Sequence, residues 1–336
     1  MKITGKRLHK VVGAIMFWVV FAGIFLAYSQ GMFKYCSANT SKIHGSFNRS
    51  WVYAVESEKE ALDVVMLGDS ECYSAFSPMQ LWNEKGIASF NYSQSGQKMQ
   101  ETYFLLKKIF EKQSPKVVML ETNLIFRKQP RLDVVQSSMD EIVSYIIPGG
   151  GVRLHDAWKI MCGQPEQKIP EYKGFYLTTG VKASKFLDYM NEKRQCKAVV
   201  REYANWYLDR VHELCEENGA ELVLVSTPST KNWNYKRHTV TEELAKDKGI
   251  TYVDLNTINI KDKEAQINWN TDTRDAGDHL NVSGAQKATK WLGEYLEAHY
   301  KFTDKRQDEE YSSWNTIGEE YENKITPMID KIRKKK

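Results

Sequence analysis

The sequence lacks the features that mark several large classes of protein. Its 336 residues include only 8 prolines and 20 glycines, and 42% are hydrophobic and 27% charged. This profile is that of a globular chain and excludes collagen-like repeats and extended disorder. At about 150 residues per domain, the chain forms one large domain or two small ones.

Paired cysteine motifs are also missing. The five cysteines show neither CxxC nor any other metal-like spacing, so the sequence predicts neither a zinc site nor a dense disulfide framework. No disulfide is predicted to be essential, and up to two could form. The cysteines are widely scattered, at Cys36, Cys72, Cys162, Cys196 and Cys215.

Positive charge is scarce in the body of the chain. The formal net charge is +4, but nine of the 47 lysines and arginines lie in residues 1–10 and 331–336, which contain no acid. The remainder holds 38 bases and 43 acids, a net charge of −5. A nucleic-acid-binding face needs clustered positive charge on a folded surface. We therefore exclude nucleic acid as a partner.

Only one hydrophobic run is long, which excludes a polytopic membrane protein. Val11–Tyr28 contains eighteen residues without a formal charge, just enough to cross a bilayer as a helix. Four bases precede this run and only Lys34 follows closely, which predicts a cytoplasmic N-terminus and an extracytoplasmic location for everything after about residue 30. A signal peptide cleaved near Ala27-Tyr28-Ser29 is the alternative. The length and bulk of the run favour an uncleaved, single-pass anchor in the cell membrane.

Five short apolar segments are typical of buried strands. They are Asp63–Leu67, Ala88–Tyr92, Lys116–Glu121, Glu221–Ser226 and Ile250–Asp254. Segments with helical periodicity alternate with them, at Gln100–Gln113, Cys196–Asn218, Thr241–Lys248 and Gly284–Ala298. Alternating strands and helices predict an α/β three-layer sandwich with a mostly parallel, flavodoxin-like central sheet. In such a sheet, ligands bind beyond the carboxyl ends of the strands.

Changes in composition divide the chain into five parts. We expect a basic cytoplasmic tip at 1–10, a transmembrane anchor at 11–30, a stalk at 31–60, the α/β domain at 61–300 and a charged, helical tail at 301–336. Residues of about 132–193 break the alternation and are interpreted as an insertion or cap. The basic end of the tail is predicted to be a solvated terminus, with contact to anionic lipid or wall polymer as the alternative.

A serine follows the first predicted strand directly. Gly68 permits a tight turn, and a serine just past a strand end presents its hydroxyl at the rim where ligands bind. Asp69 or Ser70 would serve equally well as the N-cap of a helix. Taken alone, the segment therefore favours a cap.

A histidine lies among acids near the other end of the domain. Residues 275–281 read DAGDHLN and precede a helical pattern. A serine is a poor nucleophile unless a histidine takes its proton and a carboxylate fixes the histidine tautomer. His279 is the predicted base, and the candidates for the carboxylate are Asp275 and Asp278. A surface turn with capping acids is the alternative interpretation.

Three hydrogen-bond donors follow successive strands and could form an oxyanion hole. They are the backbone amides of Ser70 and Gly96 and the side chain of Asn123. Donors around a nucleophile stabilise the oxygen charge that develops during acyl transfer.

These residues together resemble the SGNH (GDSL-like) hydrolase superfamily, whose four blocks carry Ser, Gly, Asn and His. Ser70, Gly96, Asn123 and His279 match the four blocks in order. The resemblance covers about residues 60–300. It is closest to membrane-anchored members that act on cell-envelope polymers, such as the DltD-like and alginate-acetylation proteins.

Two blocks depart from the family pattern. The last block usually reads Asp-x-x-His, but Ala276 stands three residues before His279. Asp275 is favoured as the third member because an immediate neighbour rarely reaches the ring nitrogen that faces away from the serine, and Asp278 remains the alternative. The third block lacks the Gly-x-Asn-Asp pattern around Asn123, which leaves Glu121 free for a role of its own.

The resemblance implies an extracytoplasmic serine esterase or O-acyltransferase that forms an acyl-enzyme and acts on a cell-envelope polysaccharide. It implies no cofactor and no metal. A membrane-bound O-acyltransferase of the MBOAT family is an implied partner, and membrane lipid would contact the anchor.

A catalytically silent, membrane-tethered glycan-binding or assembly protein is the alternative from another class. Aromatic residues of the insertion could form its sugar platform, although aromatic side chains are more often buried. These residues are Trp158, Tyr172, Phe175 and Tyr176. A metal enzyme ranks last, because only His279 has acids close by.

Overall fold

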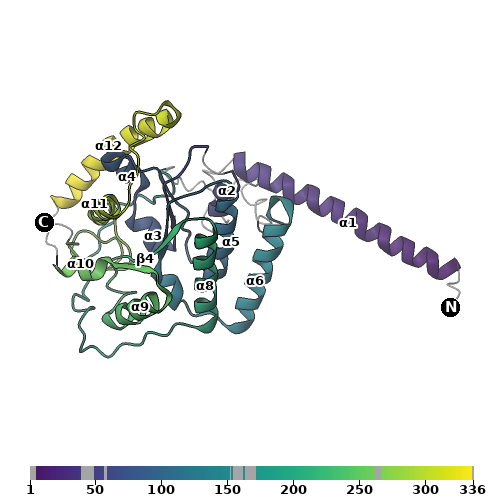
Figure 1. Ribbon diagram of the computed structural model, residues 1–336, viewed down its shortest axis with the longest axis horizontal. Helices are drawn as coiled ribbons and strands as arrows, with labels where there is room; N and C mark the ends of the chain where they lie inside the picture. Colours follow the sequence, from purple (N-terminus) through teal and green to yellow (C-terminus); the bar gives the residue numbers. More distant parts are fainter. Residues whose placement is uncertain are drawn as a thin grey trace.

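A five-stranded parallel sheet forms the centre of the protein (Figure 1). The computed structural model describes residues 5–38, 49–56, 59–151, 153, 162, 172–261 and 266–334. The strands are β1 (Val64–Leu67), β2 (Ser89–Asn91), β3 (Val117–Glu121), β4 (Glu221–Ser226) and β5 (Thr251–Asp254), in the order β2-β1-β3-β4-β5. All neighbouring pairs are parallel. The predicted α/β sheet and its five strands are therefore confirmed.

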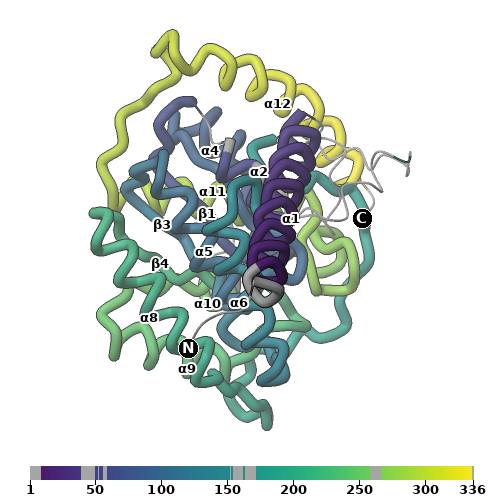
Figure 2. The backbone as a smooth tube through the Cα atoms, turned by 90° about the vertical axis from the view of Figure 1, so that its right-hand side faces the viewer, coloured from purple at the N-terminus to yellow at the C-terminus, as the bar shows by residue number. Residues whose placement is uncertain are grey.

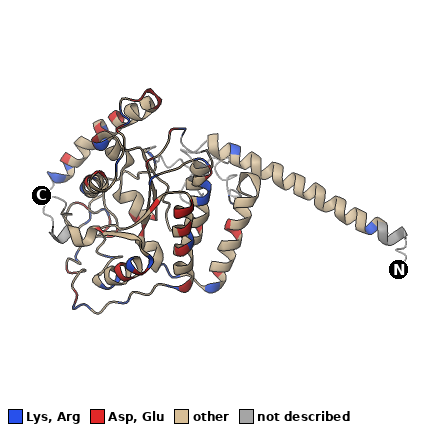
Figure 3. Ribbon diagram, in the orientation of Figure 1, with Lys and Arg blue, Asp and Glu red and all other residues tan. Residues whose placement is uncertain are grey.

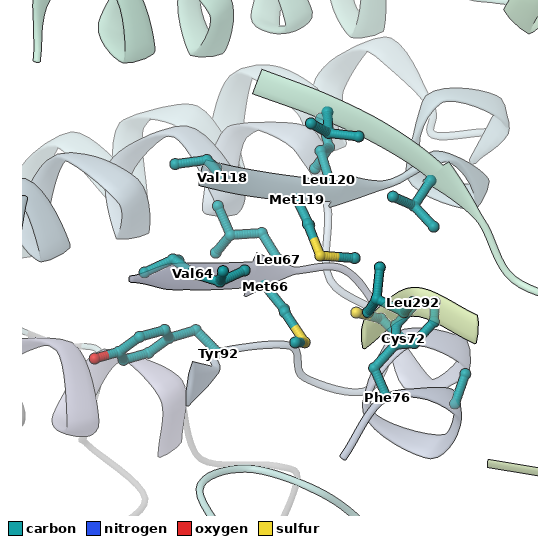
Figure 4. Close-up of a cluster of buried hydrophobic side chains, with 14 of the residues drawn as sticks. Val64, Met66, Leu67, Cys72, Phe76, Tyr92, Val118, Met119, Leu120 and Leu292 are labelled. Carbon is teal, nitrogen blue, oxygen red and sulfur yellow. The ribbon is translucent and has the colours of Figure 1, made fainter. Parts of the chain in front are cut away.

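The side chains of the central strands alternate between the two faces of the sheet. Met66 pairs with Met119 in the register of β1 and β3, and Figure 4 shows both pointing toward Cys72, Phe76 and Leu292. All five side chains are at most 2% exposed. These strands are buried on both faces, which explains why they read as continuous apolar runs rather than as alternating patterns.

Helices cover both faces of the sheet (Figure 1). They are α3 (Ser70–Ala75), α4 (Pro78–Lys85), α5 (Met99–Phe110), α6 (Arg131–Ile146), α8 (Glu202–Glu217), α9 (Tyr235–Lys248), α10 (Leu255–Lys261), α11 (Val282–His299) and α12 (Ser312–Arg333), with short 3₁₀ turns η2 (Thr122–Phe126), η3 (Pro148–Gly150) and η4 (Glu309–Tyr311). Helices α5, α6 and α8 pack together on one side, and α3, α4, α11 and α12 pack together on the other. The four helices predicted inside the domain are present with shifted ends.

The first helix, α1 (Gly5–Ala38), projects away from the domain (Figures 1 and 2). It is long and apolar enough to cross a membrane by length and composition, criteria that a signal sequence also meets. Figure 3 shows charged residues over the domain but almost none along this helix. The helix continues past the expected boundary at residue 30, and its Ser29 and Cys36 are fully buried.

Residues 31–60 differ from the stalk that we expected. Besides the end of α1, they contain α2 (Arg49–Glu56), in which Trp51 and Ala54 are buried in the core and which packs on α5. The spacing of these two residues places them on one face of a helix. An eight-residue helix is too short for its periodicity to stand out in the sequence.

The segment expected as an insertion begins with α6, which packs on α5. Residues 177–200 contain no helix or strand, yet they are fixed to the histidine loop. Lys182 N donates to Thr273 O at 2.9 Å, and Ala276 N donates to Lys182 O at 3.0 Å. This part of the segment therefore supports the candidate site directly.

The C-terminal tail packs on the domain, while Lys331, Arg333 and Lys334 at its basic end are exposed. Helix α12 packs on α4, and its Trp314 is fully buried with its ring 5.3 Å from that of Trp82. Tyr321 is 1% exposed. The tail is therefore amphipathic, as predicted, but its apolar face completes the core.

Candidate active site

Ser70 lies at the junction between β1 and α3. It is the first residue of α3, and Asp69 is the N-cap, whose side chain accepts a hydrogen bond from Glu71 N at 3.0 Å. A Cβ atom at Gly68 would lie 2.6 Å from the Cβ atoms of both Cys72 and Glu121. Only glycine therefore allows the chain to turn here and present the serine at the edge of the sheet.

His279 lies in a tight loop before α11. Ala276 and Gly277 adopt left-handed backbone conformations, with φ values of 66° and 91°. The Thr273 hydroxyl accepts a hydrogen bond from Gly277 N at 2.8 Å and donates to His279 O at 3.0 Å. Asn281 caps α11 by accepting from Ser283 N at 3.0 Å. These contacts fix the backbone on both sides of the histidine.

The structure brings Ser70, His279 and Asp275 into one chain of hydrogen bonds. The Ser70 Oγ atom lies 2.7 Å from His279 Nε2, and His279 Nδ1 lies 2.7 Å from Asp275 Oδ2. The other carboxylate oxygen of Asp275 accepts from His279 N at 2.7 Å. This geometry fits a neutral imidazole that donates from Nδ1 and accepts the serine proton at Nε2.

The pKa of Asp275 is lowered from its ordinary value. Burial alone would raise this pKa, but the hydrogen bonds from the backbone and ring of His279 outweigh burial. Asp275 is therefore ionised at neutral pH, the state required to hold the Nδ1 proton of the histidine.

Asp278 occupies a different position. Its Oδ1 atom lies 3.6 Å from His279 Nδ1, beyond hydrogen-bond distance, and accepts from Asn232 Nδ2 at 2.6 Å. Of the two acids that we considered, only Asp275 is hydrogen bonded to the ring.

Not all three residues expected to form the oxyanion hole lie at the pocket that contains Ser70. Asn123 follows β3 in η2 and lines the pocket with Ser70. Its Nδ2 atom donates to Asp69 Oδ2 at 3.1 Å, and its Oδ1 atom accepts from Arg237 at 2.8 Å. Gly96 is exposed in a turn after β2 and is not among the lining residues. Two of the three residues expected to donate, Ser70 and Asn123, therefore line the pocket.

A pocket of about 530 Å³ opens over the serine and histidine. Its lining is mostly polar and includes three bases. The residues are Asp69, Ser70, Glu71, Asn123, Phe126, Arg127, Lys128, Asn232, Arg237, Asp278 and His279. They come from the segments that follow β1, β3 and β4 and from the histidine loop. The pocket thus lies where a parallel sheet binds its ligands, beyond the carboxyl ends of the strands.

Three buried acids cluster at the pocket, and two of them, Asp69 and Glu71, line it. Asp69, Glu71 and Glu121 are each at most 4% exposed, and carboxylate oxygens of the three lie within 4.8 Å of one another. Burial and the nearby charge of Asp69 raise the pKa of Glu71 to about 8. Burial, with the charges of Asp69 and Glu71, also raises the pKa of Glu121. Both shifts favour the protonated form of the glutamates, which relieves the repulsion among the three acids.

Among the residues that the structure describes, two groups have the composition of a metal site. The first is the buried acid cluster, and the second is Asp275, Asp278 and His279. In the second group, both ring nitrogens of His279 already have hydrogen-bond partners. In the first, Asp69 is paired with Arg127. The residues of both groups are therefore engaged in hydrogen bonds and ion pairs with other protein groups.

Several residues of this network were not predicted from the sequence. Asn232 Nδ2 donates to both Glu71 Oε1 and Asp278 Oδ1 at 2.6 Å, and Arg237 donates to Asn123 and to the backbone of Asn232. Asn232 lies in the loop after β4, so the rule that ligands bind at strand ends could have identified it. No local pattern marks Arg237, which is on the first turn of α9.

Comparison with known proteins gives a limited result. No family model and no curated protein matches this chain. Among solved structures, a candidate platelet activating factor from Streptococcus pneumonia is 12% identical with a TM-score of 0.41, covering 84% of this chain and 99% of its own. A candidate acylhydrolase from Bacteroides fragilis is 12% identical, with a TM-score of 0.39 and coverages of 73% and 94%. A GDSL-like lipase from Bacteroides thetaiotaomicron is 11% identical, with a TM-score of 0.40 and coverages of 76% and 100%. At these scores the likeness identifies no activity for this chain.

Proposed function

We propose that this protein is a serine esterase or O-acyltransferase that forms an acyl-enzyme on Ser70. The observation that carries the proposal is the continuous hydrogen-bonded chain from Ser70 through His279 to Asp275. Its order and distances are those of an activated serine, in which the base contacts the nucleophile and is itself oriented by a carboxylate. The chain opens into a pocket large enough for an ester substrate.

In the first half of the reaction, His279 Nε2 takes the proton of Ser70 as Oγ attacks the ester carbonyl. The resulting oxyanion is stabilised by the Ser70 amide and by the Asn123 side chain, which lines the same pocket. The C–O bond then breaks, and the leaving alcohol receives the proton from His279. Asp275 stabilises the imidazolium formed between these two proton transfers.

In the second half, a hydroxyl group enters the site vacated by the leaving alcohol. His279 removes its proton as its oxygen attacks the acyl carbon, and the proton then returns to Ser70 Oγ as the acyl–serine bond breaks. If the hydroxyl belongs to a sugar, the product is an O-acylated glycan. If it belongs to water, the reaction is hydrolysis.

The substrate we propose is a cell-envelope polysaccharide outside the cytoplasmic membrane. Support comes from α1, which is apolar enough to anchor the chain in a bilayer, and from the polar lining of the pocket, which suits a hydroxylated sugar. The four basic residues before the apolar run favour a cytoplasmic N-terminus. A membrane-bound O-acyltransferase is the partner that would supply the acyl group.

The test is the intact mass of the full chain in detergent after exposure to a fluorophosphonate. We expect a single adduct in the wild-type protein and none in Ser70→Ala or His279→Ala. An adduct that persists in Ser70→Ala would contradict the assignment of the nucleophile. A wild-type chain that is folded and yet forms no adduct would contradict the enzyme proposal. Acetyl transfer to oligosaccharides, measured against hydrolysis, then distinguishes the two reactions.

The structure offers less support for a silent glycan-binding protein. Two of the aromatics expected in its sugar platform, Tyr172 and Phe175, are buried with their rings against Tyr321. Trp158 lies outside the described residues. Polymer binding that is unchanged in Ser70→Ala, without turnover in the wild type, would favour this function over ours.

A further inference from the structure

Helix α6 is amphipathic, but it buries polar side chains and exposes apolar ones. Its two buried residues are Glu141 and Ser144, and Glu141 is paired with Arg153. On the same side, Ser138 accepts a hydrogen bond from Tyr207. A helix on the surface of a water-soluble domain normally buries its apolar face and exposes its polar one.

The outward face of α6 carries a stripe of large apolar side chains. They follow helical spacing and are 37–83% exposed: Leu132, Val135, Met139, Ile142, Val143 and Ile146. We call these six residues the α6 stripe. Single exposed apolar residues are ordinary, but a continuous row of this size marks a surface that contacts another apolar phase.

The end of α6 is fixed to α1 at the point where α1 leaves the domain. Ser29 Oγ donates to Pro148 O at 2.9 Å, in the turn that follows α6. Gly149 packs so closely on the backbone of Ser29 that an added Cβ would lie 2.7 Å from Ser29 O. The relation between α1 and this end of α6 is therefore set by direct contacts.

The length of the apolar run places a bilayer edge at the same point. Eighteen residues of helix from Val11 to Tyr28 span about 27 Å, close to the thickness of a bilayer hydrocarbon core. Ser29 would then lie at the outer membrane surface. Figure 1 shows α6 on the side of the domain from which α1 projects and running across its direction, and Figure 2 looks onto that side.

We propose that α6 lies on the bilayer surface, with the α6 stripe inserted among the lipid headgroups and the first part of the acyl chains. A lipid contact explains why the helix exposes its apolar face. Helix α1 is the second contact with lipid, and it holds the domain at the membrane. Exposed Asp133 and Asp140 border the stripe and would remain in the aqueous headgroup layer. The proposal rests on the membrane anchoring in the proposed function, and it does not depend on the catalytic role of Ser70.

The test uses the full chain in nanodiscs that hold one molecule each. Cys162 and Cys196, the two cysteines that are not buried, are changed to serine. An environment-sensitive fluorophore is then attached to Met139→Cys on the stripe, Val19→Cys on α1 or Glu320→Cys on α12. Quenching is measured for each label with two lipids, one that carries a nitroxide near the start of the acyl chain, at the depth of the α6 stripe, and one that carries it near the end of the chain, at the depth of Val19.

We expect the Met139→Cys label to lose fluorescence with nitroxide lipid, and the label on exposed Glu320→Cys to keep it. If the Val19→Cys label is quenched but the Met139→Cys label is not, α1 is in the membrane and the proposal for α6 is overturned. If neither is quenched, both the anchor and the proposal fail. The same label is then compared in discs that hold two molecules. If the fluorescence of the Met139→Cys label changes only in these discs, the α6 stripe contacts a second copy of the chain, and the proposal is overturned.

A stripe variant provides a second test. Leu132→Ser, Val135→Ser and Ile142→Ser together should reduce quenching of the Met139→Cys label, because the apolar contact with lipid is lost. Folding should be retained, because all three side chains are exposed. Unchanged quenching of the Val19→Cys label is the matched control. Undiminished quenching at Met139→Cys would show that the stripe does not hold the helix on the membrane.

Discussion

Asn232 donates a hydrogen bond to Asp278 that holds this carboxylate away from the ring of His279. The N–O distance is 2.6 Å, while Asp278 remains 3.6 Å from His279 Nδ1. The same amide group of Asn232 also donates to Glu71. One side chain from the β4 loop thus links the histidine loop to the buried acid cluster, and leaves Asp275 as the partner of the imidazole.

Replacing each aspartate separately tests this arrangement. Asp275→Asn should lower kcat by about 10³- to 10⁴-fold, because the amide favours the wrong histidine tautomer and no longer stabilises the imidazolium. Asp278→Asn should lower kcat much less, since Asp278 makes no hydrogen bond to the ring. The measurement is turnover of an activated acetyl ester. Equal losses in the two variants, or a larger loss in Asp278→Asn, would contradict our assignment.

Glu71 should make stability depend on pH. Burial raises its pKa from 4.5 to about 8, so the folded protein holds this proton more tightly than the unfolded chain. The stabilisation is fully present below about pH 4.5 and is lost as the pH rises to about 8. Glu71→Gln carries no such proton, and its Tm should therefore fall less between pH 5 and pH 8 than that of the wild type.

Thermal unfolding of the full chain in detergent, measured across this pH range, provides the comparison. Glu243→Gln changes an exposed glutamate on α9 and should keep the wild-type dependence. In Glu71→Gln, Glu121 loses the charge of Glu71, but burial and the charge of Asp69 still raise its pKa, so the slope should decrease and not vanish. A slope in Glu71→Gln equal to that of the wild type would show that Glu71 is ionised in the folded protein.

The glycine before the nucleophile should be essential for geometry. Gly68→Ala would place a Cβ 2.6 Å from the Cβ atoms of Cys72 and Glu121, so β1 and α3 must separate. A shift of Ser70 by about 1 Å should slow acylation by about 100-fold. The rate of fluorophosphonate labelling measures this effect. Gly31→Ala, at an open position on α1, should label at the wild-type rate.

Helix α12 should contribute strongly to stability. Trp314 is fully buried against the rings of Trp82 and Tyr311, and Trp314→Ala should cost about 3–5 kcal/mol of unfolding free energy. Trp206 is 52% exposed, and Trp206→Ala should cost about 1 kcal/mol or less. Denaturant unfolding compares the two variants. Similar midpoints would show that α12 is dispensable for the core.

The strands were predictable because each is short, apolar and buried on both faces. The ends of the helices were less predictable, because they depend on the side chains that cap them. Helix α9 begins at Tyr235, where Asn234 accepts from Arg237 N at 3.0 Å, six residues before the periodicity that we recognised in the sequence. Helix α6 was missed altogether, since its polar residues face the domain and its apolar ones face outward.

Some residues of the candidate site were predictable from the sequence, and others were not. Ser70 was identifiable because it follows a strand end, and His279 and Asp275 because the chemistry of an activated serine needs a histidine beside a carboxylate. Asn232 follows β4, so its position at a strand end was predictable, but its contacts with Glu71 and Asp278 were not. Arg237 reaches the site from α9, and no local pattern marks its contact with Asn123. Gly96 matched a family block, yet it is not part of the pocket lining.

The contact between Ser70 and His279 joins residues 209 positions apart. During synthesis, the serine therefore emerges long before its base, and a partly made chain carries only an ordinary, unreactive hydroxyl. The parallel sheet delays completion further, because each strand pairs with a neighbour reached through a long crossover and such non-local topologies fold slowly. In the mechanism that we propose, the reactivity of Ser70 is thus acquired last, when the C-terminal third of the domain has assembled. An active-site probe would accordingly report the completion of folding as well as chemistry.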